Sequence, residues 1–164
     1  MSYFIIIRGP LGCGKSTIAR KLVDILNAEY ISIDEILAKN GLDEINPKIG
    51  CISEDNFIKA NEAIIPHANE MLSKGRVVIF DACFYHKKPI EHLIKKLKFP
   101  YYIFTLKAPL EVCIERDSKR EKKHGKNAAR DVYKLVSKFD YGIVIDVSKS
   151  VDKSVEEILS YLPR

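Results

Sequence analysis

The chain has 164 residues, of which 46% are hydrophobic and 30% are charged. This length supports one domain with a buried core and is too short for two ordinary domains, so we expect a single domain over residues 1–164. The net charge of +5 suits an anionic ligand, a nucleotide first and a nucleic acid second, although lysine-rich helix faces are usually solvated surface.

The cysteines and the apolar runs exclude several classes of protein. No two cysteines have C-x-x-C spacing, so a structural zinc site or a disulfide framework is not expected, and Cys83 and Cys113 have the apolar neighbours of small core residues. The first apolar run is too short for a signal peptide, and no run approaches the length of a membrane span. We therefore expect a cytoplasmic protein.

The first predicted element is a strand at 3–7, and it leads directly into GPLGCGKST at 9–17. This segment fits G-x-x-x-x-G-K-[ST], the phosphate-binding loop. The alternative is a glycine-rich surface turn that matches by chance. The context favours the phosphate loop, because Ile18, Leu22 and Ile25 then recur at helical spacing, and the motif needs a strand before it and a helix after it.

The residue types in this loop match the chemistry of phosphate binding. Glycine lets the backbone turn its N–H groups toward phosphate oxygens, and the helix that follows adds its positive N-terminal end. Lys15 would reach the β- and γ-phosphates, and the Ser16 hydroxyl would bind Mg²⁺. Cys13 would contribute its backbone N–H and needs no thiol chemistry. The nucleotide-binding residues expected in the loop are Gly9, Leu11, Gly12, Cys13, Gly14, Lys15, Ser16 and Thr17.

The remaining elements alternate between strands and helices. Short runs rich in Ile, Val, Tyr and Phe predict strands that are buried on both faces. Apolar stripes at helical spacing, at 90–97 and 151–162, lie between or after them. Such alternation predicts an α/β fold with a parallel sheet and helices on both faces. The four further strands are expected at 30–33, 77–80, 101–106 and 141–145.

Two segments are less regular. Residues 54–74 keep a helical period, but Pro66 removes a backbone donor and clashes with the preceding turn, so we expect a kink or two helices that meet near Ile65. Residues 40–53 show no period and are expected to form a mobile loop.

Two acids follow strands at the edge where open α/β sheets bind ligands. Asp34 comes after the second strand and could accept the proton of a substrate hydroxyl as that hydroxyl attacks the γ-phosphate. An ordinary N-cap of the next helix would need an aspartate equally. Asp81 ends the third strand, and its alternative is a capping or turn aspartate.

The order of these motifs selects among phosphate-loop proteins. A GTPase would need N-K-x-D and D-x-x-G signatures, and neither occurs at the required strand ends. The sequence resembles the small kinases of the nucleoside and shikimate kinase type, and most of all their chloramphenicol phosphotransferase and polynucleotide kinase branch. The resemblance rests, in chain order, on GPLGCGKST, ISIDE, VVIFDACF, LKAPLEVCIERDSKREKKHGKNAARDVY and YGIVID.

The resemblance implies a three-layer P-loop NTPase fold and roles for particular residues. It implies a five-stranded parallel sheet in the order 2-3-1-4-5, with a short lid at about 116–131. Asp34 resembles the presumed base, and Asp81 resembles the acid that holds Mg²⁺ through water. In the lid, Arg116 would lie against adenine and Arg120 would grip phosphates, since guanidinium is planar and forked.

Several of these residues have other readings. Arg116 and Arg120 share one face if both are helical, and they could instead pair with Glu115, Asp117 or Glu121. Gly125, Lys126 and Arg130 would form the lid turn and its return, with Lys126 and Arg130 as weaker candidates. Arg8 sits at the ligand edge and could contact substrate or pair with an acid. Of the histidines, His86 could touch substrate, whereas surface positions are expected for His67, His92 and His124.

Departures from the family pattern exclude some classes of acceptor molecule. Shikimate kinases carry D-x-D after strand two and a glycine triplet after strand three, and this chain has neither, so shikimate is not the expected acceptor. Residues 36–60 contain no arginine, which disfavours an acceptor that bears its own phosphate, although Lys39, Lys48 and Lys59 could substitute.

The sequence therefore predicts an ATP- and Mg²⁺-dependent phosphotransferase that acts on a hydroxyl of a small metabolite, nucleoside or polynucleotide end. Its expected catalytic residues are Lys15, Asp34 and Arg120, with Ser16 and Asp81 at the metal. We expect a monomer or weak dimer that does not bind membranes. The alternatives are a nucleotide-dependent nucleic-acid-binding protein or switch with slow hydrolysis, and a binding module without catalysis.

Overall fold

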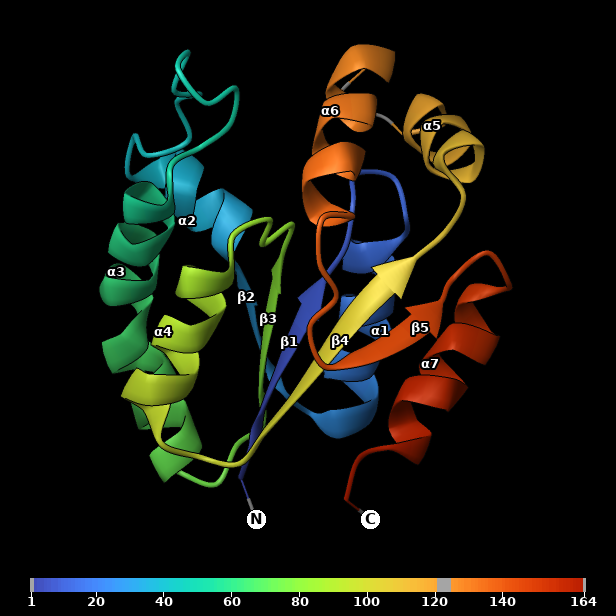
Figure 1. Cartoon of the computed structure of the whole chain (residues 1–164). Helices are drawn as coiled ribbons and strands as arrows, with labels where there is room; N and C mark the ends of the chain where they lie inside the picture. The colour runs from blue at the N-terminus through green and yellow to red at the C-terminus, as the bar shows by residue number, and fades with distance from the viewer. Residues whose placement is uncertain (1, 121–124, 164) are drawn as a thin grey trace.

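The protein was analysed as a computed structural model, which describes residues 2–120 and 125–163. A five-stranded parallel sheet runs through its centre in the order β2-β3-β1-β4-β5 (Figure 1). The predicted fold class and strand order are therefore confirmed. The strands are β1 (Phe4–Arg8), β2 (Glu29–Ser32), β3 (Val78–Ala82), β4 (Tyr101–Lys107) and β5 (Ile143–Asp146).

The strands form because short β-branched and aromatic runs can be buried on both faces at once. Every residue of β1, the central strand, and of its neighbour β3 is buried. The outer strands β2 and β5 are only partly buried, and each has four residues. The last strand begins at Ile143, two residues later than the sequence predicts.

Helices cover both faces of the sheet and separate two apolar clusters. One cluster joins one sheet face to α2, α3, α4 and the end of α6, and the other joins the opposite face to α1, α5 and α7. The helices are α1 (Lys15–Leu26), α2 (Ile33–Lys39), α3 (Glu54–Ser73), α4 (Lys87–Leu97), α5 (Leu110–Ser118), α6 (Lys126–Val136) and α7 (Val151–Ser160). None of the described helices is long and apolar enough to cross a bilayer.

The region around Pro66 differs from the prediction of two helices. α3 is one helix that continues through Pro66, which lies on its exposed side. The opposite side of α3 buries Phe57, Ala60 and Leu72 against the sheet, and this packing outweighs the one hydrogen bond that the proline removes. The segment 40–53 has no helix or strand and contains one isolated β-bridge, between Asn46 and Cys51.

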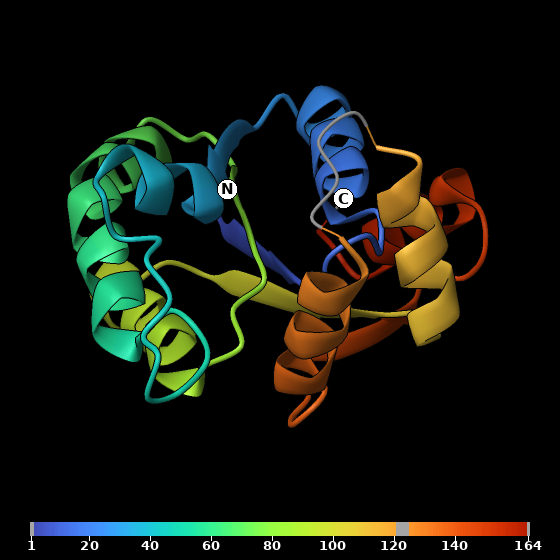
Figure 2. The same cartoon turned by 90° about the horizontal axis from the view of Figure 1, so that it is seen from above.

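The carboxyl ends of the parallel strands all meet at one edge of the sheet. The view from above this edge shows α2 and the 40–53 segment on one side and α5 and α6 on the other (Figure 2). The loop between β1 and α1, the start of α2 and the end of β3 therefore lie along the same edge, where open parallel sheets bind ligands.

Candidate functional site

The loop between β1 and α1 depends on glycine at two positions. Gly12 has a φ of +79°, and a Cβ added there would lie 2.1 Å from the carbonyl oxygen of Cys113 in α5. Gly14 has a φ of +94° and is the N-cap of α1, so that the helix begins at Lys15. A side chain would strain both positions, and the loop can therefore place its N–H groups and the start of α1 close to a ligand.

Next to the loop, the buried carboxylate of Asp81 has three polar partners. Asp81 is 3% exposed, and its Oδ2 accepts hydrogen bonds from the Ser16 hydroxyl at 3.1 Å and from the Tyr30 hydroxyl at 2.6 Å. Its Oδ1 lies 3.9 Å from the Lys15 ammonium, which is itself 7% exposed. Elements that are far apart in the sequence thus bring the phosphate-loop lysine and serine to the predicted strand-three acid.

The surroundings of Lys15 keep its ammonium charged. Burial by itself lowers the pKa of Lys15, but the neighbouring Cys83 and Asp81, and after them Cys13 and Asp34, outweigh burial and raise the pKa above its ordinary value. The lysine therefore carries a full positive charge at neutral pH, as the binding of phosphate oxygens requires.

The two candidate lid arginines do not share a helix. α5 ends at Ser118, so Arg120 lies in the turn beyond it, and the expected common helix face is wrong. Arg116 donates from one nitrogen, Nη1, to the carbonyls of Cys13 at 3.0 Å and Val147 at 2.8 Å. Arg116 thereby connects the phosphate loop to the end of β5, and its contacts are to backbone oxygens instead of the carboxylates that surface pairing would use.

Arg120 corresponds more closely to the pairing alternative. Its guanidinium lies 3.9 Å from Asp117, and its side chain is 44% exposed. The expected lid, 116–131, contains residues 121–124, so the predictions for Glu121 and His124 concern positions outside the described residues. On its return, Lys126 and Arg130 are exposed on α6, and Gly125 donates its N–H to Asp117 at 3.1 Å.

The loop, the arginines and the start of α7 enclose a pocket of about 430 Å³, which we call the cationic pocket. Four of its lining side chains carry positive charge, and none of its described lining residues is acidic. The cationic pocket therefore suits a polyanion of nucleotide size. Its lining residues are Gly12, Gly14, Lys15, Ser16, Thr17, Arg116, Arg120, Lys149, Ser150 and Val151.

Asp34 is positioned by the start of α2 but does not cap it. Ser32 is the N-cap, and its hydroxyl accepts a hydrogen bond from the N–H of Glu35, so the capping alternative for Asp34 is wrong. Asp34 is an exposed residue in the first turn of α2. Its charge contributes to the raised pKa of Lys15, and Asp34 is thus electrostatically coupled to the phosphate loop.

On the other side of the phosphate loop lies a second pocket of about 480 Å³, which we call the apolar pocket. Most of its wall is aliphatic or aromatic, and Asp34 stands in that wall with two further aspartates. Its lining residues are Leu11, Asp34, Leu37, Asp43, Ile45, Gly50, Cys51, Ile52, Phe57, Cys83, Tyr85, Ala128, Asp131, Val132 and Leu135.

The predicted nucleotide-binding residues thus divide between several places. Gly12, Gly14, Lys15, Ser16 and Thr17 line the cationic pocket, as do Arg116 and Arg120. Leu11 lines the apolar pocket instead. Gly9 and Cys13 line neither; the Cys13 side chain is buried in the core, where burial raises its thiol pKa.

Arg8 is a buried tie between the sheet and the end of α6. It is fully buried, and its guanidinium donates to the carbonyls of Phe84, Val136 and Phe139 and to the Thr105 hydroxyl, at 3.0 to 3.1 Å. Burial lowers its pKa to about 10, and Asp140 opposes that shift. Arg8 is therefore held within the fold by main-chain carbonyls, and it lines neither pocket.

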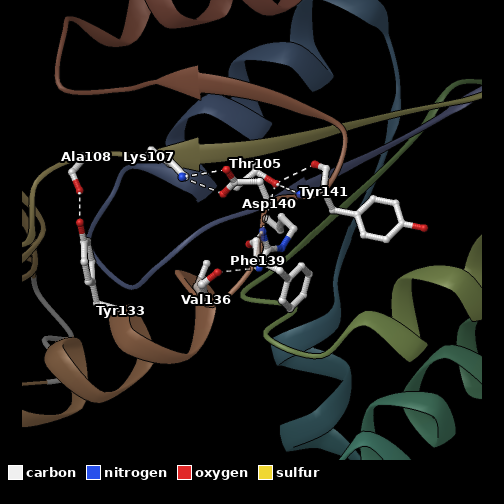
Figure 3. Close-up of polar contacts among 9 residues, drawn as sticks. Thr105, Lys107, Ala108, Tyr133, Val136, Phe139, Asp140 and Tyr141 are labelled. Carbon is white, nitrogen blue, oxygen red and sulfur yellow. Dashed lines mark hydrogen bonds and ion pairs between the residues drawn. The ribbon is translucent and has the colours of Figure 1, made fainter.

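The connection after α6 is fixed by further contacts at the same place (Figure 3). The Lys107 ammonium lies 2.7 Å from Asp140, and the Thr105 hydroxyl donates to the Tyr141 carbonyl at 2.7 Å. The Tyr133 hydroxyl donates to the Ala108 carbonyl at 3.0 Å. These contacts, with Arg8, fix the carboxyl end of α6, and α6 lines the apolar pocket from Ala128 to Leu135.

The three histidines that the structure describes line neither of the two pockets. His86 precedes α4 and contacts the carbonyl of Ile52 at 2.7 Å through Nε2, so it lines a neighbouring hollow and not the apolar pocket. His67 is an exposed residue 3.4 Å from Glu29, in agreement with its surface prediction. His92 is largely buried between Asn61 and Glu62, and its surface prediction is wrong.

Sequence reasoning missed two parts of this site. Tyr30 is the strongest hydrogen-bond donor to Asp81 by distance, but a tyrosine inside a strand pattern predicts only burial. Lys149, Ser150 and Val151 line the cationic pocket from the loop after β5 and the start of α7. The strand-end rule that identified Asp34 and Asp81 could have found them, because this loop follows a strand at the same edge.

The donor set fits Mg²⁺ bound together with a nucleotide. Mg²⁺ prefers oxygen ligands and is usually held by one or two protein groups plus phosphates and water. Ser16 and Asp81 supply such oxygens beside the cationic pocket. Among the described residues no cluster of three or more acidic, histidine or cysteine side chains could hold a metal by itself, so the phosphates would have to complete the coordination.

Comparison with known proteins identifies the family of this chain. The AAA domain family matches residues 4–137. A shikimate kinase from Mannheimia succiniciproducens is 28% identical over 161 residues, which cover 95% of this chain and 90% of that protein. These matches confirm the identification of a small P-loop kinase of the nucleoside and shikimate kinase type.

Solved structures share the fold at lower sequence identity. The unliganded crystal structure of a sugar kinase from Janibacter sp. superposes with a TM-score of 0.80 at 17% identity, and the match covers 98% of this chain and 94% of that one. The APS kinase of Mycobacterium tuberculosis, in complex with AMPPNP and APS, superposes with a TM-score of 0.69 at 14% identity, covering 97% and 96%.

Proposed function

This chain belongs to the AAA domain family and has the fold of small P-loop kinases, and from that premise we propose that it is an ATP- and Mg²⁺-dependent phosphotransferase. It transfers the γ-phosphoryl group to a hydroxyl of a small-molecule acceptor. One observation supports this most directly: a cationic pocket and an apolar pocket lie on the two sides of one phosphate loop, and Asp34 stands in the second.

The cationic pocket binds the nucleotide. The loop N–H groups and the start of α1 hold the β-phosphate, and Lys15, kept charged by its acidic neighbours, spans the β- and γ-phosphates. Arg116 holds the loop carbonyl of Cys13, so it acts by positioning the loop as well as by its charge. Ser16 and Asp81 would hold Mg²⁺, which neutralises phosphate charge when it is bound.

The apolar pocket binds the acceptor. Asp34 accepts the proton of the acceptor hydroxyl as the oxygen forms a bond to the γ-phosphorus, and the bond from that phosphorus to the β–γ bridging oxygen breaks, so that ADP leaves. Arg120 follows α5 in the segment proposed as a lid over 116–131, and its charge offsets the negative charge that develops during transfer. A single domain over 1–164 provides both the nucleotide site and the acceptor site.

The deciding experiment is a screen of hydroxyl compounds for stimulated release of ADP from Mg·ATP. The panel includes nucleosides, sugars, aromatic alcohols and 5′-hydroxyl oligonucleotides. A small hydroxyl compound that accelerates ADP release and gains phosphate supports the proposal. Release that no acceptor accelerates, together with oligonucleotide affinity that falls steeply with salt, would support the alternative of a nucleic-acid-binding switch.

A further inference from the structure

The apolar pocket is large enough for an acceptor with a hydrophobic body. Its volume of about 480 Å³ is in the range of small-molecule sites. Leu37 and Phe57 are 1% exposed, and Leu11 adds a third apolar surface from the phosphate loop. Val132 and Leu135 of α6 complete the wall opposite. This wall therefore binds the apolar part of a ligand by hydrophobic burial, which is non-directional and does not select one apolar group over another.

The charge of the pocket has one sign. Its charged lining residues, within the part of the chain that the structure describes, are Asp34, Asp43 and Asp131, and no lysine, arginine or histidine lines it. Neither Asp43 nor Asp131 forms an ion pair with another residue in the part of the chain that the structure describes. Lys138 lines a neighbouring hollow and lies outside this pocket.

An anionic acceptor would be poorly bound in such a place. A carboxylate or phosphate that enters an apolar pocket loses hydration and needs a paired cation in return. Here it would meet like charges instead. Asp43 and Asp131 are exposed, but a repulsion at a few ångströms still reduces affinity by about tenfold. A neutral hydroxyl compound meets neither cost, and its hydroxyl can still donate a hydrogen bond to Asp34.

We propose that the acceptor is an alcohol with an apolar body and no anionic group, and that Asp43 and Asp131 reject anionic alcohols from the pocket. This inference rests on the proposed function, since it names the class of acceptor for the same site. It separates this chain from relatives whose names specify a hydroxy acid, such as the shikimate kinases, and it disfavours the phosphate-bearing end of a polynucleotide.

The first test measures phosphoryl transfer to matched acceptors that differ in charge. The pairs are methyl shikimate and shikimate, sorbitol and gluconate, and adenosine and adenosine 3′-phosphate. We expect kcat/KM to be at least about tenfold higher for the neutral member of any pair that is phosphorylated. Equal or higher kcat/KM for the anionic member would overturn the inference while leaving the kinase assignment intact.

The second test reads the pocket without catalysis, so that the two proposals can fail separately. The probes are N-phenyl-1-naphthylamine and its sulfonate, 1-anilinonaphthalene-8-sulfonate, each titrated by fluorescence with Mg·AMPPNP present to occupy the cationic pocket. We expect the neutral probe to bind at least about tenfold more tightly. If neither probe binds, or the sulfonate binds as well, the inference is wrong.

Two variants locate the effect. Asp131→Lys changes a lining charge and should reduce the preference for the neutral probe by about tenfold. Asp24→Lys makes the same change on an exposed position of α1 outside the pocket and should leave the preference as it is. Equal effects of the two variants would show that net charge, and not the pocket, sets the preference. A probe preference without turnover of any acceptor would refute the kinase proposal alone.

Discussion

The two sides of the phosphate loop differ in charge and in the segments that form them. The cationic pocket carries four basic side chains from four different segments, and the apolar pocket carries three aspartates in an otherwise apolar wall. The loop itself contributes Lys15 to one side and Leu11 to the other. A difference of this kind lets one loop bind a polyanion and an uncharged alcohol in adjacent positions without competition between them.

The largest expected effect comes from removing the charge of Asp34, which tests whether the apolar pocket holds the acceptor. Asp34→Asn should reduce kcat with a true acceptor by about 10²- to 10⁴-fold, because an amide cannot take the hydroxyl proton. The KM for ATP should change little, since Asp34 lines the apolar side. Steady-state kinetics with both substrates provide the measurement.

Glu35→Gln is the matched control for Asp34→Asn. Glu35 is the next residue of α2, is exposed and does not line the apolar pocket. The kcat of the Glu35→Gln variant should therefore stay near that of the unchanged protein. If Asp34→Asn retained full transfer, the base would have to be sought elsewhere.

On the cationic side, Lys15→Met should lower kcat by about 10²- to 10³-fold, the usual cost of losing one group that stabilises transition-state charge. It should also lower the melting temperature, because Asp81 loses its only cationic neighbour within 4 Å among the described residues. Turnover at saturating ATP and circular dichroism separate the two effects. Lys134→Met, on the exposed side of α6, is the control, and comparable losses in both variants would contradict the role of Lys15.

Arg116 tests whether the cationic pocket needs a scaffold as well as a charge. Arg116→Lys keeps the charge but cannot reproduce the fixed guanidinium geometry, so we expect ATP affinity to fall by about tenfold. Calorimetric titration with Mg·AMPPNP measures the change. Lys119→Ala is the control, since the Lys119 ammonium contacts only Glu115 in the described structure. This variant should bind the nucleotide with unchanged affinity. Unchanged affinity in Arg116→Lys would leave charge as its sole contribution.

The smallest expected effect concerns one cysteine on each face of the sheet. Burial raises the pKa of Cys83 and of Cys113 to about 12, from an ordinary value of 9.0. Above pH 9 the unfolded chain therefore loses thiol protons that the folded chain keeps, and stability should fall between pH 9 and pH 12. Each group contributes at most about 1.4 kcal/mol per pH unit.

Urea denaturation at several pH values checks this decline. Cys83→Ala and Cys113→Ala should each make the fall in unfolding free energy with pH less steep, although each also leaves a small cavity at every pH. A fall of the same steepness in both variants would show that other groups cause it.

Local patterns in the sequence determined the strands, the fold class and the phosphate-loop part of the site. The glycines, Lys15 and Ser16 were predictable because a phosphate loop is a contiguous segment, and Gly12 and Gly14 indeed have the positive φ that such a loop needs. The strand order was available only through family resemblance, since apolar runs do not encode their neighbours. The strand-end rule placed Asp34 and Asp81 at the correct edge, although their roles stay predictions.

Tertiary structure alone decided the features that depend on distant residues meeting. Tyr30 reaches Asp81, Arg8 binds main-chain carbonyls after β3 and at the end of α6, and the apolar pocket combines the phosphate loop with α2, α3 and α6. Pro66 stays inside α3 because burial of the opposite helix face outweighs a local preference. The sequence by itself determined what each segment can do, because propensity and motif chemistry are local. The packing of the segments decided which charges face each other across the loop, because electrostatic selection depends on distance in space.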